Sequence, residues 1–287
     1  MASVIDLIGN TPLVELKTVS KNAAVKIFAK LEGNNPGGSV KDRPARNMIL
    51  KAIERGSLQA GMKLVEATSG NTGIALAMIS NLVGIEIDLV MPENSTIERV
   101  KTMKAYGAKV ILTPEEKGME GAIDHANTLI NGGGYFNLNQ FENPDNYDAH
   151  YKTTGPEIWN DTQHKVTHFV SAMGTTGTIM GVSRFLKEQN KTIKIIGAQP
   201  KDGSKIPGIR KWSKEYLPKI FEPNRVDQIV DVSEDEAIAM TKYLTLHEGI
   251  FCGISSGGAA HIAKKISEEI SSGIIVFIVC DRGDRYL

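Results

Sequence analysis

Short runs of β-branched and apolar residues alternate with longer stretches of helical periodicity along this chain. In the first half the runs are VKIFA, KLVEA, IDLVM and KVILT, and in the second half they are THFVSA, IKIIGAQ, DQIVDV and IIVFIVC. Strands separated by helices are typical of α/β proteins, and nearly continuous apolar runs are typical of parallel strands covered on both faces. The pattern therefore predicts an α/β fold with a doubly wound sheet.

One helix carries clear end signals. Ser95 is followed by Glu98 three positions later and by Gly107 beyond the far end, which predicts a helix from Ser95 to Tyr106 that begins with a capping box. The Gly-rich stretch 131–134 is either a loop or a boundary, and no Pro- or Ser-rich linker separates two independent halves.

The composition favours an enzyme that binds small molecules. The chain has 33 basic and 33 acidic residues, and this balance gives no electrostatic reason to expect nucleic acid or a membrane surface as a partner. Two cysteines at unrelated positions and six histidines without metal-ligand spacing predict neither a disulfide framework nor a metal site. We find no export signal and no run near the roughly 20 apolar residues of a membrane span, so a cytoplasmic location is expected.

A lysine is the first candidate for chemistry. In α/β sheets, ligands gather at the carboxyl ends of strands, and the Gly-rich segment Asn35 to Arg43 delivers Lys41 to the start of a helix that runs through Ala45 to Ala52. A helix N-terminus disfavours positive charge and would depress the pKa of the Lys41 amine, as Schiff-base formation requires. Taken alone, a solvated charge is the commoner role for one lysine, and the neighbouring Asp42 and Arg43 could simply pair or cap the helix.

Three further polar turns follow strand-like runs. The turn from Glu66 to Gly73 is crowded with hydroxyls and amides, which suits a carboxylate. The turn from Gly174 to Thr178 suits a phosphate, and it lacks the Lys-Ser/Thr ending of an ATP-binding loop, which favours a mononucleotide or pyridoxal phosphate (PLP). Gly253 to Gly258 opens another helix. Each of these turns alone could be only a helix cap.

Together these segments resemble the cysteine synthases, the O-acetylserine sulfhydrylase family of fold-type II PLP enzymes. The shared motifs run nearly end to end: IGNTPLVEL at 8–16, NPGGSVKDR at 35–43, TSGNTG at 68–73, QFENPDN at 140–146, HYKTTGPEIW at 150–159, GTTGT at 174–178, IPGIRKW at 206–212, GISSGG at 253–258 and CDRGDRYL at 280–287. The resemblance implies a homodimer with the tryptophan synthase β-like architecture of two doubly wound domains and PLP in the cleft between them. It implies a smaller, mobile domain of residues 36–145 and a larger, phosphate-binding domain of residues 1–35 plus 146–287.

The resemblance also implies a role for each motif. Lys41 would form the Schiff base with PLP and move the Cα proton of the substrate, Asn71 would bind the phenolic oxygen of PLP, and Ser255 would meet the pyridine nitrogen. A neutral hydroxyl at that nitrogen favours elimination over transamination. The residues that would hold the phosphate are Gly174, Thr175, Thr176, Gly177 and Thr178, and those that would hold the substrate carboxylate are Thr68, Ser69, Thr72 and Gln140.

The implied reaction is β-replacement on O-acetyl-L-serine, in which acetate leaves through an aminoacrylate and sulfide adds to give L-cysteine. Arg210 and Cys280 match the B-type members, whose wider and charged entrance admits thiosulfate and gives S-sulfocysteine. Lys211 stands where that type has a second arginine, and lysine lacks the planar fork that binds an oxyanion in two places. Cys280 could equally be a small buried core residue.

Other functions share part of this pattern. A cystathionine β-synthase, or a cysteine lyase that releases sulfide, would use the same cofactor contacts. A paralogue that only binds metabolites or a peptide in the carboxylate pocket is disfavoured by the presence of Lys41, Asn71 and Ser255. A nicotinamide enzyme would need G-x-G-x-x-G after the first strand of a βαβ unit, and this arrangement is not found.

Overall fold

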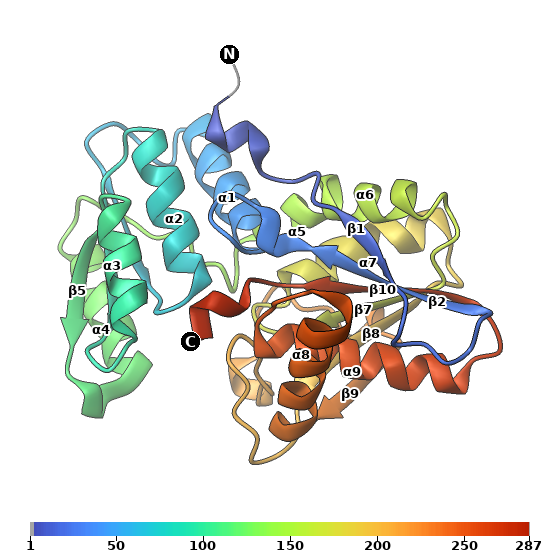
Figure 1. The fold of residues 1–287 in the computed structure, drawn as a ribbon. Coiled ribbons are helices and arrows are strands. Elements are labelled where there is room, and N and C mark those ends of the chain that lie inside the picture. The colour runs from blue at the N-terminus through green and yellow to red at the C-terminus, as the bar shows by residue number, and fades with distance from the viewer. Residues whose placement is uncertain (1–2, 287) are drawn as a thin grey trace.

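Two β-sheets with flanking helices form two lobes that lie side by side (Figure 1). The computed structural model describes residues 3–286. The larger sheet has the strand order β1-β2-β10-β7-β8-β9, and the smaller has the order β5-β4-β3-β6. The predicted α/β fold is confirmed, and it is built around two sheets.

The larger sheet carries the second half of the chain and its first two strands. Its strands are β1 (Leu13–Leu16), β2 (Val25–Leu31), β7 (His168–Ala172), β8 (Lys194–Pro200), β9 (Gln228–Val232) and β10 (Gly273–Val279). Its helices are α5 (Pro144–Lys152), α6 (Thr154–Asp161), α7 (Gly177–Gln189), α8 (Glu234–Glu248) and α9 (Ile254–Glu269). Only β1 pairs antiparallel with its neighbour. The carboxyl ends of β2, β10 and β7 are therefore neighbours, and the loops that follow them converge.

The smaller sheet is parallel throughout. Its strands are β3 (Lys63–Ala67), β4 (Ile87–Pro92), β5 (Lys109–Thr113) and β6 (Tyr135–Phe136), and its lobe contains α1 (Asp42–Glu54), α2 (Asn71–Leu82), α3 (Ile97–Ala105) and α4 (Gly118–Asn131). Every residue of β4 is buried, as its unbroken apolar run predicts. The strands β1 and β6 were not predicted, since four and two residues are too few to show a period.

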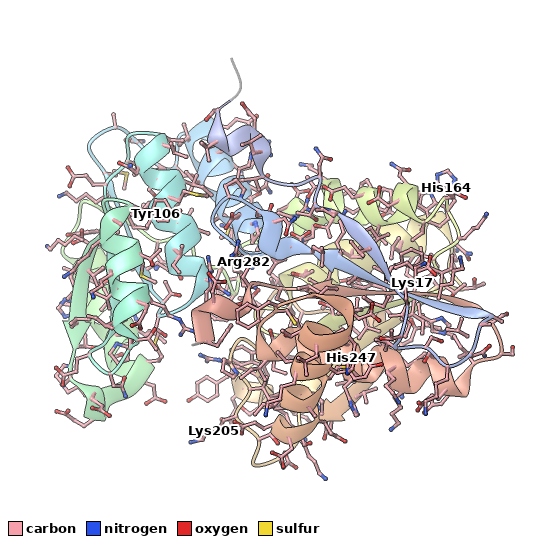
Figure 2. All side chains as sticks on the ribbon, in the orientation of Figure 1. Lys17, Tyr106, His164, Lys205, His247 and Arg282 are labelled. Atoms are coloured by element: carbon pink, nitrogen blue, oxygen red, sulfur yellow. The ribbon has the colours of Figure 1, made fainter. Side chains whose placement is uncertain are left out.

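Short 3-10 turns connect several of these elements. They are η1 (Val4–Leu7), η2 (Glu32–Asn34), η3 (Glu115–Lys117), η4 (Lys214–Tyr216), η5 (Pro223–Arg225) and η6 (Gly283–Tyr286). The last of them lies between the two lobes (Figure 1). Figure 2 shows Tyr106 on the smaller lobe, His164 and Lys17 on the larger, and Arg282 between them.

The predicted capping box of α3 is wrong. The helix begins at Ile97 with Thr96 as its N-cap, and no side chain caps it. Glu98 is therefore the second residue of the helix, one short of the third position, from which a side chain can accept from the backbone N–H of the N-cap residue. The Ser95 N–H instead donates to the Pro92 carbonyl in a turn. The same spacing does form a capping box at Ser233 and Glu236 of α8, so spacing alone does not decide the motif.

The division into domains of 36–145 and 1–35 plus 146–287 stays a prediction. All four strands of the smaller sheet fall inside 36–145. Ile8, which the prediction assigns to the larger domain, packs in one apolar cluster with Ile49, Leu76 and Leu89 of the smaller lobe. Within residues 3–286, no helix is long and apolar enough to cross a membrane.

Candidate active site

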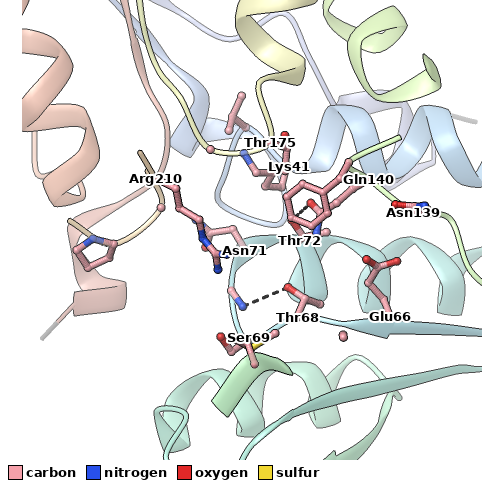
Figure 3. Close-up of a pocket in the computed structure, with 18 of the residues that line it drawn as sticks. Lys41, Glu66, Thr68, Ser69, Asn71, Thr72, Asn139, Gln140, Thr175 and Arg210 are labelled. Atoms are coloured by element: carbon pink, nitrogen blue, oxygen red, sulfur yellow. Dashed lines mark hydrogen bonds between the residues drawn. The ribbon is translucent and has the colours of Figure 1, made fainter. Parts of the chain in front are cut away.

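A cavity of about 820 Å³ lies where the loops of the two sheets meet (Figure 3). It brings together most of the predicted site residues: Lys41, Thr68, Ser69, Asn71, Thr72, Gln140, Gly174, Thr175, Thr178, Arg210, Ser255 and Cys280. Thr176 and Gly177 belong to the same turn as Thr175 but do not line the cavity, and Lys211 lies outside it. The volume suits a cofactor together with a small substrate.

Lys41 stands immediately before α1, at the end of the loop that follows β2 and η2. The loop is tied to the larger sheet because the Val40 N–H donates to the Cys280 carbonyl (2.7 Å). The half-buried Lys41 side chain points into the cavity near Thr175 and Gln140 (Figure 3). Its amine has no hydrogen bond or ion pair with any residue between 3 and 286. An amine without a partner in a cavity is available to a ligand.

The turn between β3 and α2 presents hydroxyl donors to the same space. Thr72 Oγ1 donates to Gln140 Oε1 (2.9 Å). Within residues 3–286 the side-chain N–H groups of Gln140 have no partner, so they are available to a ligand. Thr68 and Ser69 line the cavity beside them, and α2 begins at Asn71 without a side-chain cap. Uncapped N–H groups and hydroxyl donors together suit a carboxylate.

The turn that precedes α7 is shaped to receive an anion. Thr176, the N-cap of α7, adopts a left-handed conformation (φ 68°), and its side chain caps none of the first N–H groups of the helix. The Gly177 N–H has a long contact with Thr175 Oγ1 (3.4 Å). The buried Thr176 Oγ1 has no partner within residues 3–286. A Cβ at Gly177 would lie 2.0 Å from Asn146 Oδ1, so only glycine permits this packing. Helix N–H groups left open in this way suit a phosphate.

Sequence reasoning gave no role to His150, which lies directly behind this turn. Burial holds the pKa of the ring well below its ordinary value, and the charges of Arg43 and Lys41 act in the same direction. The neutral ring contacts Thr154 Oγ1 (2.9 Å) and Thr178 Oγ1 (3.3 Å). His150 therefore orients the Thr178 hydroxyl, a role that helix position alone could not reveal.

Trp212, to which the sequence analysis gave no functional role, packs edge-on against Phe141 at 5.6 Å between ring centroids. Its indole N–H also donates to the Gly174 carbonyl (2.8 Å). The guanidinium of Arg210 lies over the same indole at 5.4 Å. Trp212 thus links Gly174, in the turn that is predicted to bind phosphate, to the side chain of Arg210.

Ser255 and Cys280 lie together on the side of the larger sheet. Ser255 is in the first turn of α9, and Cys280 directly follows β10. Burial raises the pKa of the Cys280 thiol to about 12, although Lys41 and Ser255 act against the shift. Cys280 is therefore a neutral thiol near pH 7 and does not act as an anionic nucleophile.

Residues 4–281 match the family described as pyridoxal-phosphate dependent enzyme. Cysteine synthase B of Pseudomonas aeruginosa is 55% identical over 285 residues, covering 99% of this chain and 95% of that protein. The chain belongs to the PLP-dependent cysteine synthases. Among solved structures, cysteine synthase of Entamoeba histolytica matches with a TM-score of 0.95 at 41% identity, covering 100% of this chain and 89% of that one. A hydrogen sulfide-producing enzyme of Fusobacterium nucleatum matches with a TM-score of 0.93 at 38% identity, covering 100% of both chains.

The residues of this cysteine synthase fit its cofactor. Within residues 3–286, the Lys41 amine and the Thr176 hydroxyl have no partner and Thr176 does not cap α7, so an aldehyde and a phosphate could each supply the missing contacts. The predictions of family, enzyme class and PLP dependence are therefore confirmed. The individual roles of the site residues stay predictions.

Lys211 does not reach the site of this cysteine synthase. Its ammonium pairs with Asp202 (2.9 Å), in the loop that follows β8, and with Asp231 (3.2 Å) of β9. These partners raise the pKa of the amine. A side chain engaged in this way does not extend the positive charge of Arg210 into the cavity.

Glu66, at the end of β3, is a buried acid in the cavity wall that sequence reasoning did not single out. Burial raises its pKa to about 8, against which only the Asn139 backbone N–H acts. Its Oε2 atom has no partner within the described residues. Glu66 lies beside Asn139 (Figure 3), and Asn139 directly precedes Gln140. A neutral carboxyl group therefore supports the turn that carries Gln140.

We expect Glu66→Gln to change how stability depends on pH. The folded pKa of about 8 lies above the ordinary value of 4.5, so the wild-type side chain stabilises the fold fully below about pH 4.5 and loses this contribution as pH rises through 8. The variant should match the wild type near pH 5 and gain in melting temperature up to pH 8.5. A difference of one unit between the folded and unfolded pKa changes the free energy of unfolding by about 1.4 kcal/mol. Thermal melts of both proteins across this range, with the exposed Glu116→Gln as control, test this; a difference that does not vary with pH would contradict it.

Proposed function

We propose that this enzyme makes L-cysteine by β-replacement on O-acetyl-L-serine with sulfide, and that it accepts thiosulfate as a second sulfur donor to give S-sulfocysteine. One observation carries the proposal. The unpaired Lys41 amine shares a single cavity with the hydroxyl turn at Thr68 to Thr72 and with the anion-binding turn at Gly174 to Thr178. A carboxylate site and a phosphate site on either side of an amine suit an amino acid substrate and PLP.

Different residues around the cavity have different roles in this reaction. Bound PLP supplies an electron-withdrawing ring that stabilises negative charge at the Cα atom of the attached amino acid. Lys41 Nζ would hold the cofactor and would then take and return the Cα proton. Ser255 would meet the pyridine nitrogen with a neutral hydroxyl, and Gly174 to Thr178 would hold the phosphate.

The smaller lobe holds the other end of the substrate. Thr68 and Ser69 would donate their hydroxyl hydrogens to the carboxylate together with the amide of Gln140. The Thr72 hydroxyl, which donates to Gln140 Oε1, would hold that amide in place beside the carboxylate. We propose that this contact draws residues 36–145 toward the larger domain, because the ligand is then shared between the two lobes. Closure excludes water from a reactive intermediate.

Arg210 is the residue that we expect to distinguish thiosulfate from sulfide. It lines the cavity and is exposed, with its guanidinium over Trp212. Arg210→Met should lower kcat/KM for thiosulfate about tenfold or more, since it removes a charged donor to the dianion, and should change the rate with sulfide little. Steady-state kinetics with both donors measure this. Lys205→Met removes a charge from the same loop as a control, and an equal loss with both donors would contradict the role of Arg210.

Lys211→Met should lower kcat/KM for thiosulfate less than Arg210→Met does, because the Lys211 ammonium is paired with Asp202 and Asp231 and does not line the cavity.

The Fusobacterium nucleatum enzyme points to a second candidate function. That protein is described as producing hydrogen sulfide, and it shares the whole fold with this chain. Product analysis with O-acetyl-L-serine plus sulfide, with L-cysteine alone, and with O-acetyl-L-serine plus homocysteine distinguishes cysteine synthesis from a lyase and from cystathionine formation. If the enzyme releases sulfide from L-cysteine faster than it incorporates sulfide into O-acetyl-L-serine, the proposal is wrong.

We also propose that the enzyme forms a homodimer, and sedimentation velocity tests this.

A further inference from the structure

The segment 281–286, here called the 281–286 turn, follows β10 and contains η6. It lies between the lobes (Figure 1), and its residues Asp281 and Tyr286 line the cavity. Neither residue was predicted to belong to the site. The only sequence signal was that the polar motif CDRGDRYL directly follows a central strand, at the same edge of the sheet as the other functional loops.

Asp281 holds one side of the Asn71 amide. Asp281 is 1% exposed, and its Oδ2 accepts from Asn71 Nδ2 (2.6 Å) and from the Tyr286 hydroxyl (2.6 Å). The turn is also packed tightly, because a Cβ at Gly253 would lie 2.2 Å from Asp281 Oδ1. Asp281 therefore has little freedom to move away from Asn71.

Arg285 holds the other side of the same amide. Its guanidinium donates to Asn71 Oδ1 and, through the second terminal nitrogen, to the Gly37 carbonyl. A guanidinium only donates, and the Asp281 oxygen accepts, so these two partners fix which end of the Asn71 amide is oxygen and which is nitrogen. One Nδ2 hydrogen of Asn71 then remains free to donate to a ligand in the cavity.

Arg285 also ties Asn71 to the loop that carries Lys41. Gly37, which receives the second guanidinium bond, donates through its own N–H to Asp42 Oδ2 (2.5 Å), next to Lys41. A Cβ at Gly38, which has φ 80°, would lie 2.6 Å from the guanidinium, so the loop admits Arg285 only with glycine there. The turn reaches the smaller lobe a second time, where Arg99 of α3 lies over the Tyr286 ring at 5.6 Å.

We propose that the 281–286 turn is a clasp in which Asp281 and Arg285 are positioning residues for Asn71, and that it holds this amide toward PLP in fixed register with Lys41. The inference rests on the proposed contact between Asn71 and the cofactor. Without the clasp the amide can rotate and the two loops can separate, so the cofactor should be held less tightly even when its covalent attachment is intact.

The test is the rate at which the holoenzyme loses PLP during dialysis, followed by its visible absorbance. Arg285→Met removes both guanidinium bonds and keeps the apolar stem, and it should speed the loss about 10- to 100-fold, as expected for bonds that involve a charged group. Arg282→Met is the matched control, since Arg282 lies in the same turn but is mostly exposed and pairs only with Asp284 (3.1 Å) among the described residues. It should retain the cofactor like the wild type.

A double-mutant cycle with Asn71→Ala separates a positioning role from general damage. If Arg285 acts through Asn71, the double variant Asn71→Ala/Arg285→Met should lose PLP no faster than Asn71→Ala alone. Additive effects, or no effect of Arg285→Met, would overturn the clasp. If Asn71→Ala alone leaves retention unchanged, the proposed cofactor contact of Asn71 is wrong as well. Arg285→Lys keeps the charge without the fork, so it gives a folded variant for the same cycle if the methionine variant is unstable.

Discussion

Replacing Lys41 with alanine should lower the rate of cysteine formation at least about a thousandfold, because it removes both the covalent anchor of PLP and the group that moves the Cα proton. The substitution should leave the fold intact, since the Lys41 amine has no partner within residues 3–286 whose loss would cost stability. Initial rates with O-acetyl-L-serine and sulfide measure the first effect, and thermal melts of the cofactor-free proteins measure the second.

The anchor can be located independently of activity. Reduction of the wild-type holoenzyme with borohydride, followed by digestion and mass spectrometry, should place the cofactor mass on the peptide that contains Lys41 and on no other lysine peptide. Lys51→Ala is a control on the same helix, because Lys51 pairs only with Glu54 at the surface among the described residues (2.5 Å). Cofactor mass on another peptide, or a Lys41→Ala variant with the activity of the wild type, would show that Lys41 is not the residue that binds PLP covalently.

Replacing Arg43 with methionine should cost about 3–5 kcal/mol of stability, because it leaves a buried acid without its cation. Arg43 Nε donates to Glu32 Oε2 (2.7 Å), and both side chains are almost fully buried. Although burial acts against it, Arg43 holds the pKa of Glu32 below its ordinary value. The melting temperature should fall by about 10 °C, as thermal denaturation will show.

Two further variants decide whether the Arg43 effect comes from the lost charge pair. Arg43→Met/Glu32→Gln removes the uncompensated charge and should recover a large part of the loss. Arg225→Met breaks an ion pair with Glu222 in which both side chains are more than a third exposed, and it should change stability by less than about 1 kcal/mol. If the double variant is as unstable as the single one, packing of the Arg43 side chain, and not its charge, supports α1.

The ion-pair partners of Arg43 could not be predicted from its neighbours in the sequence. Asp42 and Arg43 follow Lys41 directly, and pairing between them was one expectation. In the structure, Arg43 turns away to Glu32 and to Glu157 (2.6 Å), while Asp42 accepts from Gly37. The partners of Arg43 are 11 and 114 residues away, so only the folded chain selects them.

The sequence by itself determined the strands, because their apolar runs are set by burial on both faces of a sheet, and all eight predicted runs form strands of the two sheets. It also determined the family, since the glycine- and hydroxyl-rich loops occur in order at the ends of those strands. Tertiary structure decided what each side chain does within the site. It turned Lys211 outward to Asp202, buried Glu66 without a partner for one of its oxygens, and placed Asp281 and Arg285 on either side of Asn71. The physical reason is that burial and pairing are set by the folded chain. The partners of Asn71, for example, are 210 and 214 residues away from it, and no local pattern records such distances.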